Sequence, residues 1–480
     1  MAKSIKKNTL FNIIKTCSSI LFPLIVFPYV SRTLLPDNIG KVNFAQSFVS
    51  YFALIASLGV QTYAIRECAA VSNDKRKLSN ISSQIFSINM CMTIVAYVAL
   101  FITLLFANKV QNYRTLIIIQ SATILFTTLG SDWLNSAMED FKYITLRTIG
   151  FQILSLIAMF NFVHTPNDYY KYAIITVLST SGANITNIWY RKKYCDVKFT
   201  LDIEWKRHMV PISLLFVMML SQTIFHNADI TMLGLMKDDY QVGLYTTAHK
   251  VTNLVSTVVQ SVILVVIPRL SQLFANNDWE SANNLLRKLL LLNIGLGLPC
   301  VTGVIMLAKD ITWLVGGDEF AEAAPVMQIL ILAFMFSLVG GSFLGNAVLI
   351  PTKNEKYYMI VCCITAVANV IINAILIPHL AAIGAAIATA FNGLIILLLL
   401  LLKVDKRLII ERKLNIFLGP IIGCVGICLC CFFAANLSNL WLRVSVSIIS
   451  SAIVYAIILQ LCKNDFIKEI LEILKSKVKR

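Results

Sequence analysis

The sequence predicts an all-α integral membrane protein with about fourteen transmembrane helices and both termini in the cytoplasm. Its 480 residues are 58% hydrophobic and only 14% charged, unlike the composition of water-soluble globular domains. The apolar residues gather into blocks of about 20, the length that a helix needs to cross about 30 Å of hydrocarbon. Basic residues occupy the short segments between these blocks. The composition and the pattern therefore indicate a chain threaded repeatedly through a bilayer.

The apolar blocks follow one another along the whole chain. They predict helices at residues 9–31, 41–65, 82–107, 114–136, 146–163, 171–190, 209–234, 243–267, 288–308, 325–350, 357–377, 383–402, 414–434 and 441–462. The first block follows Lys3, Lys6 and Lys7 as in a signal peptide, but it is too long and lacks a small-residue cleavage site. We therefore expect it to be retained as the first helix.

The loops support this topology because cytoplasmic loops of membrane proteins are enriched in Lys and Arg. With the N-terminus inside, about 31 basic residues fall in inner segments, about 8 in outer loops, and Lys15 and Lys250 within helices. The net charge of +16 thus reflects topology and does not indicate nucleic acid binding. Outer loops are short, the longest being about 309–324, so we expect no folded outer domain. Segments 270–290 and 465–480 are amphipathic and are expected along the inner membrane surface.

The cysteines indicate neither a disulfide framework nor a metal centre. Most of the twelve fall inside apolar blocks, and Cys68 and Cys195 lie in predicted cytoplasmic loops. A cluster in the thirteenth predicted helix lacks His or acidic partners, so we interpret it as packing residues. Its members are Cys424, Cys428, Cys430 and Cys431. We assign no metal and no cofactor.

A faint internal repeat at an offset of about 203 residues divides the chain. Gly40 and Ala45 correspond to Gly243 and Ala248, at the starts of the second and eighth predicted helices. Transporters are often built from duplicated helix bundles. We predict one six-helix bundle at 1–207, a second at 208–404, and a final helix pair with an amphipathic tail at 405–480.

Polar stripes run along the first, second, seventh and eighth predicted helices at helical spacing. They comprise Asn8, Asn12, Lys15 and Ser19; Asn43, Ser47, Ser50, Ser57 and Gln61; Gln222, His226 and Asp229; and Lys250, Asn253, Thr257 and Gln260 or Ser261. The stripes could line a hydrated cavity, but each neutral side chain could equally serve helix packing.

The ionisable residues within these helices are expensive to insert and point more strongly to function. The expected cavity is cationic and suits an anion such as a pyrophosphate, although Arg32 could instead anchor a helix end. Its predicted lining is Lys15, Arg32, Arg147, His249, Lys250 and Asn253. Asp229, beside His226, is the first candidate for binding a proton or coupling ion, and Asp132 is the second.

Enzyme and nucleotide signatures are missing from the sequence. There is no GxxxxGK[ST] loop and no HExxH motif. Energy for transport would therefore come from the membrane potential or an ion gradient, not from ATP bound to this chain.

The stretch FPYVSRTLLPDNIGKVNFAQSFVSYFALIASLGVQTYAIRE, Phe27–Glu67, resembles bacterial polysaccharide flippases, the O-antigen or repeat-unit translocases of the multidrug/oligosaccharidyl-lipid/polysaccharide exporter superfamily. Further similar stretches are NADITMLG (227–234), VGLYTTAHKV (242–251) and LIPTKNEK (349–356). One departure is Leu35, where many relatives have glycine, and we expect a slight effect from it.

The resemblance implies two six-helix bundles forming a V, a final helix pair, and alternating access with a cationic cavity. It implies that an undecaprenyl-pyrophosphate oligosaccharide is carried from the inner to the outer leaflet of a bacterial inner membrane. The expected partners are this lipid-linked oligosaccharide, membrane lipids and other polysaccharide-assembly proteins, with no nucleic acid.

Two alternatives remain open at the level of sequence. The first is a drug or peptidoglycan-precursor transporter of the same superfamily. The second is a polysaccharide polymerase, although such enzymes resemble one another by a large outer loop that this chain lacks.

Overall fold

The computed structural model describes residues 5–405, 407–408, 415–462 and 464–466. Every regular element in these ranges is helical. By length and composition, nine of the described helices can cross a membrane, or ten if the bent pair Asp239–Ser261 and Val266–Ala275 forms one span. The predicted all-α membrane fold is therefore confirmed at this coarser level. The predicted 465–480 tail segment lies almost wholly outside the described residues.

The chain divides into two compact units, Met1–Gly243 and Leu244–Arg480. The first unit contains α1 (Ile5–Ser57), α2 (Val60–Ala70), α3 (Lys75–Phe106), α4 (Asn108–Gln111), α5 (Arg114–Gly130), α6 (Trp133–Ala137), α7 (Phe141–Phe162), η1 (Pro166–Asp168), α8 (Tyr169–Val177), η2 (Leu178–Gly182), α9 (Ala183–Tyr190), η3 (Arg191–Lys193) and α10 (Trp205–Met236). Contacts thus group α10 with the preceding helices. The boundaries predicted at 207 and 404 stay a prediction.

Helix α11 (Asp239–Ala275) starts in the first unit and continues into the second. The remaining elements of the second unit are α12 (Trp279–Gly316), η4 (Asp318–Phe320), α13 (Ala323–Ser337), η5 (Leu338–Leu349), α14 (Glu355–Leu401), α15 (Asn415–Ala434) and α16 (Leu440–Leu461). Since α11 ends at Ala275 and α12 begins at Trp279, the segment predicted as amphipathic at 270–290 is divided between the ends of two long helices. Its position along the inner membrane surface stays a prediction.

Helix α1 is bent at Leu35, between the first two predicted helices. Its 53 residues would measure about 80 Å if straight, far more than a bilayer core. The break occurs where Leu35 adopts φ 66° and ψ 166°, ahead of Pro36. Only glycine adopts this region readily, and a leucine there costs on the order of 1–3 kcal/mol. The replacement of the relatives' glycine is therefore more costly than the slight effect we expected.

The two glycines matched by the internal repeat each pack closely against the segment that contains the other. A Cβ on Gly40 would lie 1.8 Å from the Asp239 carbonyl oxygen, and one on Gly243 would lie 2.1 Å from that of Pro36. Pro36 and Asp239 are separated by the same 203 residues as the two glycines. Such a reciprocal contact is what a local two-fold relation between duplicated segments produces, so the geometry supports the faint repeat at this point.

Helix α14 has a similar break in the second unit. Ala381 adopts φ 48° and ψ −127°, and Pro378 lies just before it. The break falls in the gap predicted between helices 357–377 and 383–402. Both α1 and α14 are thus long helices with a kink inside them. In each case the kink falls in the gap that hydropathy predicted between two helices.

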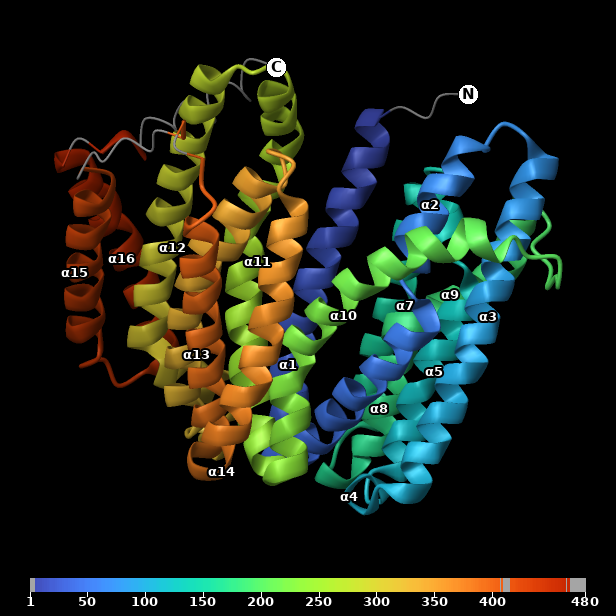
Figure 1. Cartoon of the computed structure of the whole chain (residues 1–480). Coiled ribbons are helices and arrows are strands. Elements are labelled where there is room, and N and C mark those ends of the chain that lie inside the picture. The colour runs from blue at the N-terminus through green and yellow to red at the C-terminus, as the bar shows by residue number, and fades with distance from the viewer. Residues whose placement is uncertain (1–4, 406, 409–414, 463, 467–480) are drawn as a thin grey trace. The chain divides into compact units, whose positions relative to one another are not determined.

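One end of the first unit is closed by a core of buried side chains from α2, α3 and α6. Tyr63, Cys68, Ile85 and Trp133 pack there with Cys195, which follows η3. In Figure 1 this end, with the α2–α3 turn, lies opposite α4. All twelve cysteines lie in the described ranges, and no disulfide joins any two of them there.

Candidate substrate-binding site

The most polar centre described inside the first unit forms where α5 is interrupted. Helix α5 ends at Gly130, Ser131 adopts a left-handed φ of 49°, and α6 begins at Trp133. Asp132 therefore lies at the start of a short helix, in the break between two segments. Its side chain is 27% exposed and accepts a 3.2 Å hydrogen bond from Asn135 Nδ2.

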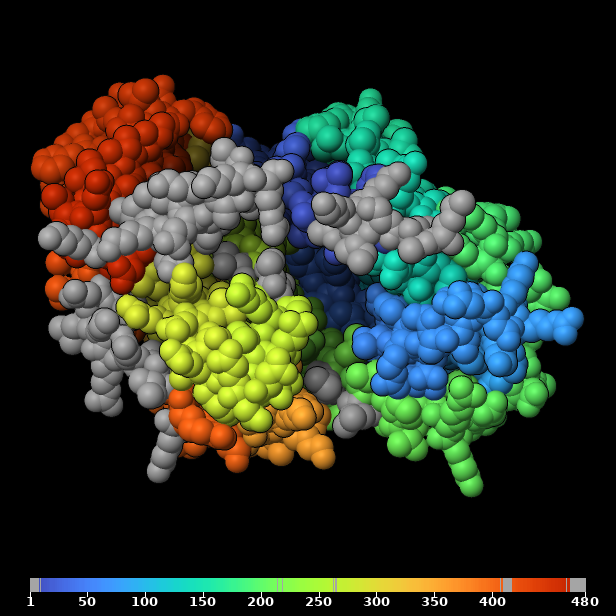
Figure 2. All heavy atoms as spheres, turned by 90° about the horizontal axis from the view of Figure 1, so that it is seen from above, coloured from blue at the N-terminus to red at the C-terminus, as the bar shows by residue number. Residues whose placement is uncertain are grey.

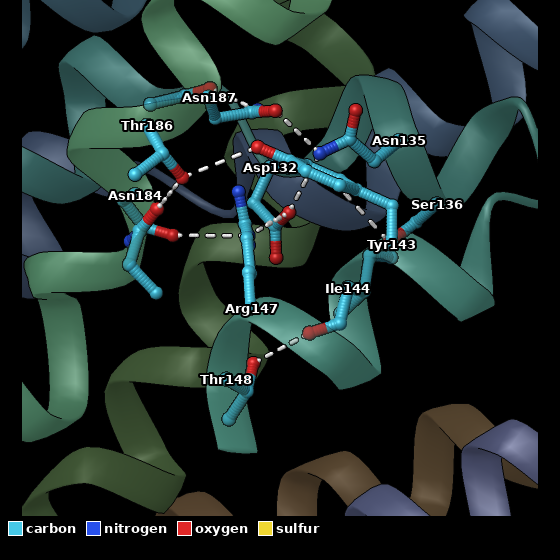
Figure 3. A network of polar contacts seen from close by, with 12 residues as sticks. Asp132, Asn135, Ser136, Tyr143, Ile144, Arg147, Thr148, Asn184, Thr186 and Asn187 are labelled. Atoms are coloured by element: carbon cyan, nitrogen blue, oxygen red, sulfur yellow. Dashed lines mark hydrogen bonds and ion pairs between the residues drawn. The ribbon is translucent and has the colours of Figure 1, made fainter. Parts of the chain in front are cut away.

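Arg147 of α7 forms an ion pair with Asp132. Its Nη2 donates to Asp132 Oδ1 and also, at 3.3 Å, to Asn184 Oδ1 of α9 (Figure 3). The Arg147 side chain is only 7% exposed. A charge buried this deeply requires a partner, because an uncompensated ion in a low-dielectric interior is strongly destabilising. The sequence analysis gave these two residues separate roles, whereas the structure joins them.

The close approach of α9 makes this arrangement possible. A Cβ on Gly130 would lie 2.6 Å from the Cβ of Asn184, so only glycine lets the end of α5 contact α9 this closely. Asn187, one turn further along α9, accepts a 2.6 Å hydrogen bond from Asn135. The π-helical turn η2 precedes these residues, and such turns occur frequently at functional sites.

Two nitrogens of Arg147 make no hydrogen bond within this network. Nε and Nη1 are buried and have no hydrogen-bond partner among the described residues. A buried donor without a partner costs about 1–3 kcal/mol. These donors can be satisfied by water or by an acceptor-rich ligand such as a phosphate or a sugar hydroxyl. The centre thus presents unused hydrogen-bond donors on a fixed cation.

An aromatic wall fixes the orientation of Arg147. Its guanidinium carbon lies 5.3 Å from the ring centroid of Tyr143, one turn earlier on α7. Tyr143 stacks on Tyr190 of α9 with a centroid distance of 3.4 Å and an interplanar angle of 6°. The Tyr143 hydroxyl lies 3.2 Å from the Thr186 hydroxyl. Tyr143, itself packed on Tyr190, therefore restricts the guanidinium on one side.

The other cations predicted in this unit do not join this network. Lys15 is half-buried on the face of α1 that contacts α7. On either side of it, Phe11 O accepts from Thr145 at 3.0 Å and Ser18 donates to Gln152. Thr145 and Gln152 lie on a different face of α7 from Arg147. Arg32 is exposed near the bend of α1.

The residues predicted for ion coupling are separated in the same way. Asp132 is used in the ion pair with Arg147, while Asp229 and His226 lie three residues apart on α10. Asp229 is buried and His226 is exposed. The spacing keeps this pair on one helical face, as the sequence predicted.

His249, Lys250 and Asn253 lie on α11 in the second unit. The first two are half-buried and Asn253 is exposed. The His249 ring stacks on Tyr245 with a centroid distance of 5.9 Å, and the Tyr245 hydroxyl lies 3.3 Å from that of Thr389 on α14. These residues are therefore held within their own bundle.

The second unit also contains an apolar groove of about 830 Å³ between α12, α15 and α16. Small residues open it, among them Gly303 of α12 and Ala452 of α16, and aliphatic side chains such as Leu307 and Ile427 line its walls. Such a groove fits an alkyl or polyprenyl chain.

Sequence reasoning missed four residues around Arg147: Asn135, Tyr143, Asn184 and Asn187. Asn184 and Asn187 lie three residues apart on one face of the predicted helix 171–190, which was the available signal for a polar face. Their proximity to Asp132 could not be predicted, because it depends on the interruption of α5 and on the close contact at Gly130.

The fold is that of an all-helical protein with many helices long and apolar enough to cross a membrane. The sequence model of the polysaccharide biosynthesis protein family matches residues 5–274, and the chain belongs to this family. The model of the lipid II flippase MurJ matches residues 240–455. The resemblance noted from Phe27–Glu67, to polysaccharide flippases of the exporter superfamily, is thereby confirmed.

Named relatives match most of the chain. A capsular polysaccharide biosynthesis protein, CapF, from Staphylococcus aureus is 22% identical over 82% of this chain and 97% of its own length. A putative O-antigen transporter from Shigella dysenteriae is also 22% identical, over 82% of this chain and 99% of its own length.

Two solved structures show the fold. The lipid II flippase MurJ in an inward closed conformation matches with a TM-score of 0.76 at 16% identity, covering 96% of this chain and 100% of that chain. An inward-facing multidrug resistance MATE family transporter of the MOP superfamily matches with a TM-score of 0.62 at 15% identity, covering 87% and 94%. The chain therefore has the helical fold shared by these transporters.

Proposed function

We propose that this protein translocates a lipid-linked oligosaccharide, carried on undecaprenyl pyrophosphate, from the cytoplasmic to the outer leaflet of a bacterial inner membrane. Family membership and relatives that include a putative O-antigen transporter support transport of this class of molecule. The structural observation that carries the proposal is the buried Arg147 with two unpartnered nitrogens. The protein acts as a transporter and not as an enzyme.

The Arg147 centre suits the polar part of such a substrate. A guanidinium binds phosphate oxygens through directed, charge-assisted hydrogen bonds. Asp132 keeps the arginine charged and oriented, while Asn184 and Asn135 add amide groups that can exchange hydrogen bonds with hydroxyls. In this proposal, the substrate replaces water at Arg147 Nε and Nη1.

The apolar groove of the second unit suits the lipid part. Its lining of aliphatic and small residues offers no hydrogen-bond demand to a polyprenyl chain.

We propose fourteen crossings with both termini in the cytoplasm, and with halves bounded near residues 207 and 404. The described helices support this count when α1 and α14 are each divided at their bends, and α8–α9 and α13–η5 each form one span. The alternation of basic loops supports the orientation. Alternating access then exposes the cavity first to one leaflet and then to the other.

Coupling to an ion gradient or to the membrane potential would act through Asp229 and His226. A buried carboxylate in a membrane helix is a natural site for a proton or cation. Lys15, Arg32, His249, Lys250 and Asn253 would add to the lining of the transport path. Membrane lipids and other polysaccharide-assembly proteins are its proposed partners.

The proposal is tested by deleting the gene and following undecaprenyl-linked repeat units with a membrane-impermeant reagent that oxidises outer-leaflet sugars. Labelled repeat units should fall to background in the deletion strain while total repeat units accumulate. Normal labelling in that strain would overturn the proposal.

The match of the lipid II flippase model to residues 240–455 favours a second candidate, transport of a peptidoglycan precursor. Proteoliposomes loaded separately with lipid II and with a lipid-linked repeat unit distinguish the two. We expect faster translocation of the repeat unit, and the reverse order would favour the precursor.

A further inference from the structure

The segment between α9 and α10 alternates polar and apolar residues without exception from Asp196 to Lys206. Such a period of two is typical of a half-buried strand. The structure nevertheless contains no partner strand for it among the described residues. Residues 196–204, here called the strap, run instead as extended chain beside α3 (Figure 1).

The strap is held by a ladder of serines on α3. The backbone N–H groups of Asp196, Lys198 and Thr200 donate to the hydroxyls of Ser79, Ser83 and Ser87 at 3.3, 3.1 and 2.8 Å. Four helical residues rise about 6 Å and two extended residues about 6.6 Å, so the two periods match. Every second amide of the strap therefore finds a hydroxyl one helical turn further along α3.

Both ends of the strap are fixed. Before it, Cys195 is fully buried and the Tyr194 hydroxyl donates to Asp140; burial and this hydrogen bond raise the pKa of Tyr194. After it, the Glu204 amide donates to Gln84 Oε1 at 3.1 Å. The same oxygen lies 2.9 Å from Nε2 of the buried His208.

This attachment leaves an apolar face outward. Val197 packs against the core at the end of the unit, but Phe199 is 53%, Leu201 85% and Trp205 45% exposed. Exposed apolar side chains in regular alternation are costly in water. On α10, Val210 is also exposed, at 72%.

Basic residues flank this apolar face. Lys192, Lys193, Lys198, Lys206 and Arg207 lie within or beside the strap, against the acidic Asp196, Asp202 and Glu204. Seen end on in Figure 2, the blue segment around residue 75, which adds Lys75, Arg76 and Lys77, lies beside the green segment around residue 205. The net positive surface complements anionic lipid headgroups.

We propose that the strap is an interfacial anchor whose Phe199 and Leu201 insert, with Trp205 at the start of α10, into the leaflet on the cytoplasmic side, while its basic neighbours contact anionic headgroups. Extended backbone near the hydrocarbon needs partners for its amides within the protein, and the serine ladder supplies them for the amides of Asp196, Lys198 and Thr200. Aromatic residues at the boundary of the hydrocarbon strengthen such anchoring. The anchor fixes the point at which α10 enters the membrane, whatever substrate the protein carries.

The test places an environment-sensitive fluorescent amino acid at position 198, 199, 201 or 202 of the full-length protein in nanodiscs. We expect brominated phospholipids to quench positions 199 and 201 several-fold more than positions 198 and 202, and aqueous iodide to give the opposite order. Adding phosphatidylglycerol should increase lipid quenching at 201. Equal iodide quenching at all four positions would overturn the proposal.

A control with Ser83→Ala and Ser87→Ala tests the ladder itself. These changes remove two hydroxyls from α3 and add no side-chain volume at these buried positions. We expect the alternation of quenching to be lost while the thermal unfolding of the protein remains cooperative. An unchanged alternation would show that the serines do not hold the strap in place.

Discussion

Two polar regions of the first unit differ in one respect that separates structure from function. In the seam between α1 and α10, the Ser47 hydroxyl donates to Asn227 O at 3.0 Å and lies 2.7 Å from the Thr231 hydroxyl. In the Arg147 centre, by contrast, two buried nitrogens have no partner in the described part of the chain. Ser47, Thr231 and Arg147 all lie on helices long enough to span a membrane.

The difference teaches that a polar stripe in a membrane helix has to be judged by whether its groups are satisfied. Asn43 and Ser47 are buried and bonded, so part of the second predicted stripe serves helix packing. Arg147 keeps unused donors although its burial is costly, which favours a binding role. Substitutions in the two regions test this difference, beginning with the one of largest expected effect.

Asp132→Ala should destabilise the protein by about 3–5 kcal/mol, because it leaves the Arg147 charge buried without its partner. Thermal or denaturant unfolding of the purified protein in detergent measures this loss. The double variant Asp132→Leu with Arg147→Met is the matched control and should recover most of it. A single variant as stable as the wild type would show that the pair is not needed to hold the arginine.

Gly234→Ala should destabilise the seam by about 1–3 kcal/mol. A Cβ on Gly234 would lie 2.1 Å from the ring of Phe44, which is fully buried. Gly150→Ala on α7 is the control, since a Cβ there meets nothing within 4 Å, and it should be neutral or slightly stabilising. Equal effects of the two variants on the melting temperature would contradict the close packing of the seam.

Replacing both partners of the seam, with Ser47→Ala and Thr231→Val, should change the stability by less than about 1 kcal/mol and leave transport intact. Satisfied polar pairs between membrane helices contribute on average about 0.6 kcal/mol, so the loss of this pair should cost little stability. Unfolding and translocation are measured on the same preparation. A large loss of transport would place this seam in the transport path.

The sequence predicted the membrane fold well. Burying charge in lipid is costly, so each spanning segment can be recognised on its own as an apolar block with few charges. The bends at Leu35 and Ala381 fall in predicted gaps. It did not show that segment 270–290 is divided between the end of α11 and the start of α12. It also missed the strap, although its strict alternation was visible, because a strand-like pattern has no obvious place in an all-α protein.

The candidate site was predictable only as a set of residue types. Arg147 and Asp132 stood out as charges in apolar surroundings, which local sequence shows. Their pairing, and the contributions of Asn184 and Tyr143, depend on contacts between α5, α7 and α9 that no local pattern encodes. Gly130 is required by close packing against α9, but the sequence does not show which residue of α9 it contacts.

The central claim is that the unpartnered nitrogens of Arg147 bind the polar part of the substrate. Arg147→Lys tests it most directly, because lysine keeps the charge beside Asp132 but lacks the forked donors. We expect initial translocation of a lipid-linked oligosaccharide in proteoliposomes to fall about tenfold, which corresponds to about 1.4 kcal/mol, with little change in melting temperature. The variant Arg66→Gln, at an exposed residue, is the control. Its initial translocation should remain within about twofold of the wild type, since a single surface ion pair contributes little. Wild-type translocation by Arg147→Lys would contradict the claim.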